Sequence, residues 1–185
     1  MGQAALHREN LVRTAMRLFR RQGYASTGLS QILAESGAPK GSLYHYFPDG
    51  KEGLGLEAVE LAGALMREEL AALAKRHASP ESFLRAYGRR MAGWMQESGF
   101  HSGCPLATTL LETAPASEPI TEAGERALDS WADVIAEVFE RDGAPRRAAN
   151  ERARLVIAAM QGALILARVR RSTRPILEVA KLARL

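Results

Sequence analysis

The chain has 185 residues, is 46% hydrophobic but only 6% aromatic, and carries a formal net charge of +4 at pH 7. This length can bury a substantial core, and the scarcity of β-branched and aromatic clusters argues against a sheet. Its most apolar stretch, residues 155–167, is too short for a membrane span, which needs roughly 20 apolar residues. The start of the sequence lacks the apolar core of a signal peptide. Cys104 is the single cysteine, so no intramolecular disulfide can form and a reducing cytoplasm is expected.

The net charge is unevenly distributed along the chain. Residues 1–51 contain seven arginine and lysine residues but three acidic residues, whereas the remainder contains 18 of each kind. All of the excess positive charge therefore lies in the N-terminal part, as attraction to the phosphates of a nucleic acid would require. A solvated helix face in a basic protein would give the same count, and charge alone does not separate the two interpretations.

The first predicted helix spans residues 6–22 and has an apolar stripe that includes Leu11, Leu18 and Phe19. Gly23 ends it. Ser26 and Thr27 precede the next helix, where a hydroxyl can cap free backbone N–H groups.

Residues 29–47 predict two short helices joined by a tight turn. Ile32 and Leu33 give the first helix a buried side, and Gly37 follows where a left-handed C-terminal residue is favoured. Pro39 fits the entry of the second helix, whose inner face is Leu43 and Phe47. This arrangement is typical of a helix–turn–helix, in which the second helix presents outward side chains to the major groove of DNA.

Several polar residues of this segment are candidate DNA contacts. Gln31 can bond adenine in a bidentate manner and Ser30 can contact a base or a phosphate, although either could equally be an ordinary exposed residue. Lys51, at the start of the fourth helix, can pair with a phosphate. The remaining candidates lie on the second helix of the helix–turn–helix: Lys40, Ser42, Tyr44 and His45 project outward, and Gly41 allows the backbone to approach the groove closely.

The first 55 or so residues resemble the N-terminal domain of TetR-type (tetracycline-repressor-like) transcriptional regulators. The resemblance is carried by Phe19, residues 23–27, Ile32 and Gly37, and by KGSLYHYF with the Lys51-Glu52 pair. It implies that Lys40 contacts bases or phosphates, that Tyr44 contacts phosphate or a thymine methyl, and that Thr27 reaches a phosphate. The longer turn FPDGKEGL and the later GCPLATTLLE are similar to the LmrA/YxaF-type branch.

The rest of the chain predicts further helices at about residues 51–77, 79–96, 105–113, 120–141, 146–170 and 175–185. We therefore expect an all-α fold of about nine helices. Residues 1–50 form a three-helix, helix–turn–helix DNA-binding domain, and residues 51–185 form a helical domain that binds an effector and dimerises. The resemblance implies both roles of the second domain.

An effector pocket is expected among apolar residues of the central helices, where this family holds its ligand. Aromatic and methionine side chains line hydrophobic pockets well, but they fill cores equally well, and core packing is the better interpretation for any single residue. The expected ligand is small and mostly apolar. By analogy with the LmrA/YxaF-type branch, we expect a planar, flavonoid- or drug-like compound. The candidate residues are Met91, Trp94, Met95, Phe100, Cys104, Leu111, Trp131 and Ile135.

A stripe of mostly small residues on the eighth predicted helix lets two helices approach closely, within one chain or between two. The resemblance implies a homodimer formed by the last two helices of each subunit, which would bind a palindromic operator in double-stranded DNA. The candidate interface residues are Ala158, Ala159, Gly162, Ala163, Leu166 and Val179.

Enzymatic function has little support in the sequence. His101 and Cys104 are three residues apart, but a structural zinc site usually needs four ligands, and no phosphate-binding glycine loop or nucleophile motif occurs. We expect no cofactor, no metal and no membrane association. The prediction is a repressor that a small effector releases from DNA. An activator or a ligand-independent DNA-binding protein remains an alternative, as does a helical enzyme or scaffold.

Overall fold

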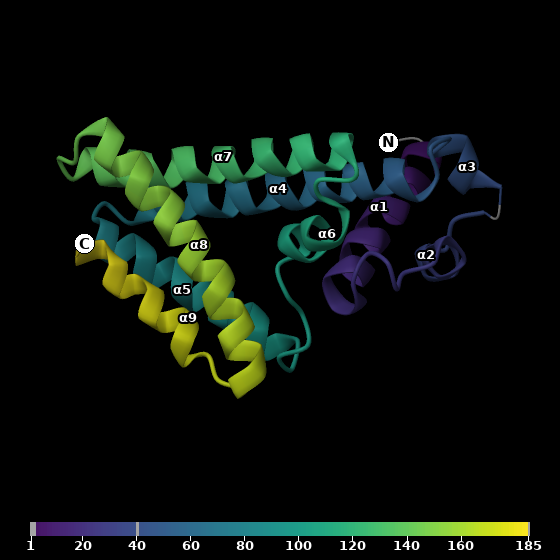
Figure 1. Ribbon diagram of the computed structural model, residues 1–185. Coiled ribbons are helices and arrows are strands. Elements are labelled where there is room, and N and C mark those ends of the chain that lie inside the picture. The colour runs from purple at the N-terminus through teal and green to yellow at the C-terminus, as the bar shows by residue number, and fades with distance from the viewer. Residues whose placement is uncertain (1–2, 40, 185) are drawn as a thin grey trace. The chain divides into compact units, whose positions relative to one another are not determined.

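The computed structural model describes residues 3–39 and 41–184, and all the regular structure in these residues is helical (Figure 1). This confirms the predicted all-α class. The helices are α1 (Gln3–Gln22), α2 (Leu29–Ser36), α3 (Ser42–Tyr46), α4 (Lys51–Arg76), α5 (Pro80–Glu97), α6 (Pro105–Thr113), α7 (Glu118–Arg141), α8 (Arg146–Arg170) and α9 (Arg174–Glu178), with a 3₁₀ helix at Val179–Arg184.

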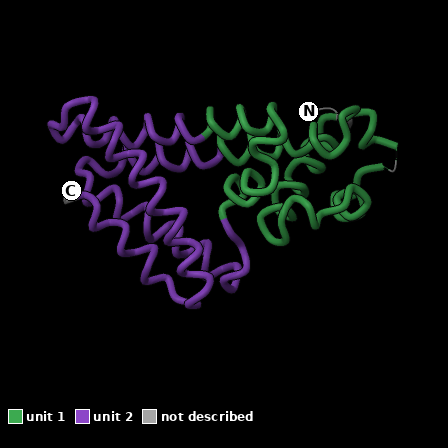
Figure 2. Tube along the Cα trace, in the orientation of Figure 1, with its two compact units in different colours: residues 1–64, 104–127 green, residues 65–103, 128–185 purple. Residues whose placement is uncertain are grey.

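Two compact units make up the chain (Figure 2). Unit 1 consists of residues 1–64 and 104–127, and unit 2 consists of residues 65–103 and 128–185. The division does not follow the expected boundary after residue 50. Unit 1 also contains the first half of α4, all of α6 and the start of α7, so the expected helix–turn–helix segment shares a compact unit with a helix some sixty residues further along the chain.

Unit 1 is built around the apolar side of α1. Leu11 and Phe19 are fully buried, and they form one core with Ile32 of α2 and Leu43 of α3. The α4 and α7 backbones lie close together in this unit, because a Cβ built on Gly63 would lie 2.7 Å from the Cβ of Ala127. Glycine is therefore what permits this approach.

Unit 2 is an all-helical bundle with a dense core. Its largest fully buried side chains are Leu70, Phe83, Leu84, Tyr87, Trp131 and Phe139. The α5 helix and the C-terminal segment are in close contact, since a Cβ on Gly88 would lie 3.3 Å from the carbonyl oxygen of Ile176.

Most predicted helix ends agree with the structure within one to three residues, and two differ for a local reason. The α3 helix begins at Ser42 instead of at Pro39, because the N–H of Ser42 bonds the Pro39 carbonyl oxygen (2.9 Å) in a turn that precedes the helix. The last predicted helix is α9 followed by a 3₁₀ turn, so only Arg174–Glu178 is α-helical.

Over the described ranges, none of the helices combines the length and apolar character needed to span a bilayer. The same residues contain no group of three or more His, Cys, Asp or Glu side chains placed to hold a metal ion.

Candidate nucleic-acid interface

The α2 and α3 helices form the predicted helix–turn–helix. Gly37 ends α2 with φ of 68° in the left-handed region, as predicted, because a side chain there would be strained. Leu43 and Phe47 are buried against the unit 1 core, at 2% and 1% exposure. Anchoring these two residues turns Tyr44 and His45 away from the core, whereas Tyr46 packs against it.

The outward side of α3 carries an exposed aromatic side chain. Tyr44 is 68% exposed. His45 beside it is exposed and meets the ring of Tyr46 edge-on, with 5.0 Å between ring centroids. Gly41 and Ser30 are also exposed. Lys40 lies outside the described residues.

Gln31 belongs to a polar network across α1 and α2. Its amide donates to a carboxylate oxygen of Glu35 (2.9 Å) and accepts from the amide of Gln22 (2.9 Å). Arg17 donates to the other Glu35 oxygen (2.8 Å). The hydrogen bond from Gln31, followed by that from Arg17, lowers the pKa of the Glu35 carboxyl. Gln31 would have to leave these partners to read a base, and that contact stays a prediction.

The hydroxyls of Thr27 and Ser42 both form local hydrogen bonds; the burial of Thr27 corrects its expected phosphate contact, whereas the DNA contact of Ser42 stays a prediction. Thr27 is fully buried, and its hydroxyl donates to the Gly23 carbonyl oxygen (2.7 Å). It therefore neither caps α2, whose N-cap is Gly28, nor faces a phosphate. Ser42 donates its hydroxyl to the Pro39 carbonyl oxygen (2.7 Å), so this donor serves the turn before α3.

Lys51 packs on the turn between α1 and α2. Its ammonium donates to the Ala25 carbonyl oxygen (3.2 Å) and lies 4.5 Å from the centre of the Tyr24 ring. Burial lowers the pKa of Lys51, and the carboxylate of Glu112 opposes that shift. One of three ammonium N–H donors is used in this way. The phosphate contact therefore stays a prediction, beside a packing role that the sequence did not suggest.

Tyr24 fixes the same turn against two helices. Its ring lies 5.0 Å from the ring of Phe19 on α1. A Cβ on Gly55 of α4 would lie 2.8 Å from a Tyr24 ring carbon, so glycine admits the ring. Burial, and then the nearby Glu52 carboxylate, raise the pKa of the Tyr24 hydroxyl.

Glu112, on the last turn of α6, is a contact that sequence reasoning missed. Its carboxylate accepts backbone N–H groups from Tyr24 (3.2 Å) and Ala25 (2.6 Å). In the sequence, 88 residues separate Glu112 from Tyr24, and no local pattern signals the contact.

Ion pairs use several N-terminal arginines. Arg13 pairs with Glu9 (2.8 Å), Arg17 with Glu35 (2.8 Å), and Arg8 with Glu57 of α4. Exposed pairs of this kind contribute little stability. These ion pairs leave the net positive charge of residues 1–51 unchanged, but they show that neighbouring carboxylates neutralise part of the arginine charge.

The expected effector residues are divided between the two units. Cys104 and Leu111 belong to unit 1, and the other six belong to unit 2. Leu111 is 80% exposed, which corrects its expected place in a pocket wall. Met91, Met95, Cys104, Trp131 and Ile135 are buried, and Trp94 and Phe100 are half-buried. Phe100 has φ of 65°, which is a strained conformation for a bulky residue.

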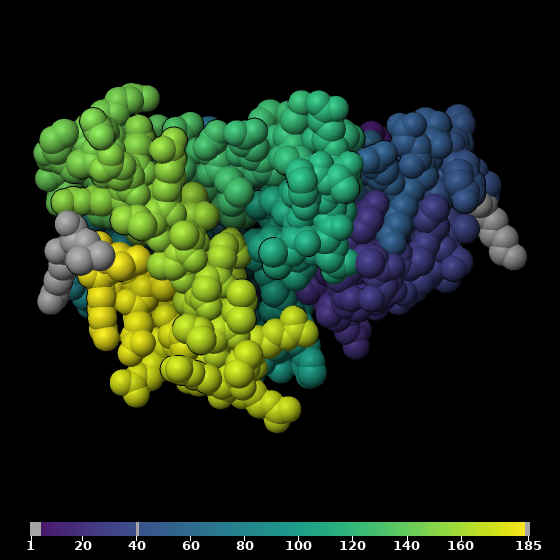
Figure 3. All heavy atoms as spheres, in the orientation of Figure 1, coloured from purple at the N-terminus to yellow at the C-terminus, as the bar shows by residue number. Residues whose placement is uncertain are grey.

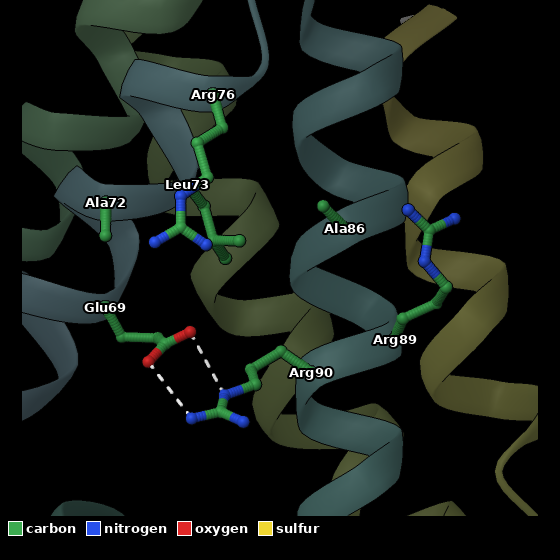
Figure 4. Close-up of a pocket in the computed structure, with 7 residues that line it drawn as sticks. All are labelled: Glu69, Ala72, Leu73, Arg76, Ala86, Arg89 and Arg90. Carbon is green, nitrogen blue, oxygen red and sulfur yellow. Dashed lines mark hydrogen bonds and ion pairs between the residues drawn. The ribbon is translucent and has the colours of Figure 1, made fainter.

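Two surface clefts are lined by residues other than the expected effector residues. The first, about 460 Å³ in volume, lies between α4 and α5 in unit 2. In Figure 4, Arg76 and Arg90 extend into it from opposite helices, and Arg90 holds Glu69 through two nitrogens, with Nε 3.0 Å from the carboxylate. The second, about 710 Å³, lies between α1 and α4 in unit 1. Neither is lined by an expected effector residue.

One side of α8 is apolar and exposed. Leu155, Ile165 and Val169 are 60%, 61% and 77% exposed, and Leu166 is 46% exposed. Ala158 and Gly162 lie on the same side and are also exposed. The α8 surface is visible in yellow-green in Figure 3. Ala163 and Val179, each 5% exposed, are instead buried within unit 2, which corrects their expected place at an interface.

Comparisons with known proteins agree with this arrangement. Residues 11–58 match the family of bacterial regulatory proteins, tetR family, and residues 80–182 match the C-terminal domain of the LmrA/YxaF-like transcriptional regulators. The HTH-type transcriptional regulator LmrA of Bacillus subtilis is 35% identical over 173 residues, covering 94% of this chain and 92% of LmrA. The HTH-type transcriptional repressor NemR of Escherichia coli is 26% identical over 179 residues, covering 91% of this chain and 87% of NemR.

A solved structure with the same fold is regulatory protein TetR from Rhodobacter sphaeroides, with a TM-score of 0.85, 23% identity and coverage of 97% of this chain and 98% of that one. The two family matches and the LmrA relationship span both the helix–turn–helix and the C-terminal helices. The chain therefore belongs to the TetR family of DNA-binding transcriptional regulators, in the branch of LmrA and YxaF.

Proposed function

We propose that this regulator is a homodimeric repressor that binds a palindromic operator through α3 and leaves it when a small, mostly apolar effector binds. The observation that carries the proposal is the construction of α3. Leu43 and Phe47 fix the helix to the core, whereas Tyr44 stays 68% exposed between them. A helix held in this way can enter the major groove without rearranging its own unit.

Tyr44 and His45 are the side chains we assign to the DNA surface, with Ser30 and the backbone at Gly41 beside them. The Tyr44 hydroxyl can donate to a phosphate, and its ring can pack on a thymine methyl. Lys40 directly precedes Gly41 in the sequence, and we assign it a base or phosphate contact.

The exposed side of α8 is the proposed dimer interface. Leu155, Ala158, Gly162, Ile165 and Val169 recur at steps of three and four residues, which is the spacing of helices that pack side by side. A second copy of the chain would cover this apolar surface with the same surface of its own α8. Two-fold symmetry would then present two α3 helices to two operator half-sites about one DNA turn apart.

The effector site is proposed among the buried residues Met91, Met95, Trp131 and Ile135 of unit 2. The strained backbone of Phe100 supports a functional role for the loop after α5, since strain of this kind gathers at ligand sites. An effector that binds one conformation more tightly would shift the population away from the one that fits DNA. Like the family, the protein would act in the cytoplasm.

Transcription in vitro tests this proposal. The template is a promoter carrying a site that the protein selects from a pool of its own genomic fragments. A repressor lowers the transcript yield, and the Tyr44→Ala variant should not. Planar, mostly apolar compounds, with the flavonoid quercetin among them, are then added at increasing concentration, and at least one of them should restore transcription. Increased transcription with the protein alone would establish an activator instead, and repression that a panel of planar apolar compounds leaves unchanged would contradict effector release.

A further inference from the structure

Glu112 holds the segment that leads into the DNA-binding helices. That segment, residues 23–28, connects α1 to α2 and contains the two N–H groups whose hydrogen bonds Glu112 accepts. Hydrogen bonds to an ionised acceptor are roughly twice as strong as neutral ones. The two bonds also point from successive residues to the two oxygens of one carboxylate, which restrains the orientation of the turn.

Lys51 contacts the same turn, Gly23 leaves room for the carboxylate, and Ser117 binds the residues after α6 to α4. Lys51 donates to the Ala25 carbonyl oxygen (3.2 Å), so adjacent backbone groups of the turn are bound by a carboxylate and by an ammonium. Gly23 has φ of 91°, and a Cβ at this position would collide with the Glu112 carboxylate. Ser117, just beyond α6, donates its hydroxyl to Glu52 on the first turn of α4 (2.5 Å). The end of α6 and the residues after it are thus bound to the turn after α1 and to the first turn of α4, on either side of the helix–turn–helix.

From these contacts we infer that Glu112 is a positioning residue for DNA binding, because its carboxylate fixes the turn that orients α2 and α3. Glu112 itself does not touch DNA in this inference. The inference rests on the proposed function of α3 as the DNA-reading helix.

The sign of the effect separates positioning from simple electrostatics. Removing a negative charge from a DNA-binding unit should tighten DNA binding, because repulsion of the phosphates is reduced. Loss of the carboxylate clamp should weaken binding instead. Glu125 provides a matched control, since it is an exposed glutamate on α7 in the same unit and its replacement by alanine removes the same charge.

The experiment measures the affinity of the full chain for a selected operator, with wild type, Glu112→Ala, Glu112→Gln and Glu125→Ala in parallel. We expect Glu112→Ala to bind at least about tenfold more weakly, a change of roughly 1.4 kcal/mol. Glu112→Gln keeps one acceptor oxygen but turns an amide N–H₂ toward the second donor, so it should lose about threefold. Glu125→Ala should bind as wild type or slightly more tightly.

Amide hydrogen exchange supplies a readout that a general loss of stability would not produce. In Glu112→Gln, which is nearly isosteric and should fold normally, the amides of Tyr24 and Ala25 should exchange faster while those of the α1 interior keep their protection. Glu112 variants that bind DNA as tightly as Glu125→Ala would overturn the inference, as would unchanged exchange at both amides. Failure of the wild type to bind any fragment would instead refute the proposed function.

Discussion

At the residue scale, the position that carries most of the functional argument is Tyr44. Its side chain is exposed on a helix whose neighbours Leu43 and Phe47 are almost completely buried. Truncating Tyr44 removes no core contact, so its effect on DNA binding can be separated from its effect on folding.

We expect Tyr44→Ala to weaken operator binding by at least about tenfold, since a hydrogen bond to a charged phosphate contributes roughly 1.5–3 kcal/mol. The thermal unfolding midpoint should stay within a degree or two of wild type. Tyr44→Phe distinguishes the two contact modes, because it keeps the ring for a thymine methyl but loses the hydroxyl. Wild-type affinity in the alanine variant, measured by fluorescence anisotropy, would show that α3 does not contact DNA through this residue.

Gly23 is expected to be intolerant of substitution. Gly23→Ala should lower the free energy of unfolding by roughly 1–3 kcal/mol, because φ of 91° strains an L side chain. Gly93 is the matched control: it lies inside α5, with nothing within 4 Å of a Cβ built on it. Gly93→Ala should raise the free energy of unfolding by about 0.5–1 kcal/mol. Urea denaturation measures both, and equal stabilities of the two variants would refute the assigned strain.

Residues whose roles depend on neighbours in the sequence could be predicted from the sequence. Gly37, Leu43 and Phe47 follow from helix periodicity and from C-terminal capping, and the structure confirms them. Thr27 and Glu112 could not be assigned in this way. The hydroxyl of Thr27 is buried by tertiary packing around the turn. The carboxylate of Glu112 contacts its partners only because the chain folds α6 against the turn after α1.

At the scale of elements, the sequence predicted the order and most of the ends of the helices, since caps and periodicity are local signals. The end of the chain was harder, because a 3₁₀ turn and an α-helix have similar apolar spacing over six residues. Whether a small or apolar residue of α8 faces its own unit or solvent depends on the packing of unit 2. Ala163 is buried, whereas Gly162 beside it is exposed.

The α8 interface predicts a specific loss of assembly. Ile165→Glu would place a charge at the centre of the proposed interface, where an unpaired charge costs several kcal/mol. We expect the dimer dissociation constant to rise by at least about 100-fold, measured by analytical ultracentrifugation, with helix content unchanged. Leu111→Glu is the matched control, because Leu111 on α6 is 80% exposed and lies outside the proposed interface. A dimer in Ile165→Glu as strong as in the control would exclude this side of α8.

At the scale of the whole molecule, the sequence indicated a DNA-binding regulator for two reasons. The helix–turn–helix is a local motif, and the excess positive charge of the chain lies in the first 51 residues. The sequence could not predict which helices belong to each compact unit. Unit 1 includes α6, so the compact unit that contains the helix–turn–helix is larger than the first three helices. The effector site stays a prediction for the same reason, since buried apolar residues fill cores and line pockets alike.

The central claim is that this protein recognises a specific DNA sequence as a dimer. A mobility-shift measurement with the DNA directly upstream of its own gene, in excess competitor DNA, tests it most directly. We predict a specific complex that weakens as salt is raised and protects two half-sites about one helical turn apart, because phosphate contacts release counterions and a dimer presents two α3 helices. Folded, dimeric protein that forms no specific complex with this DNA or with a pool of genomic fragments would contradict the account.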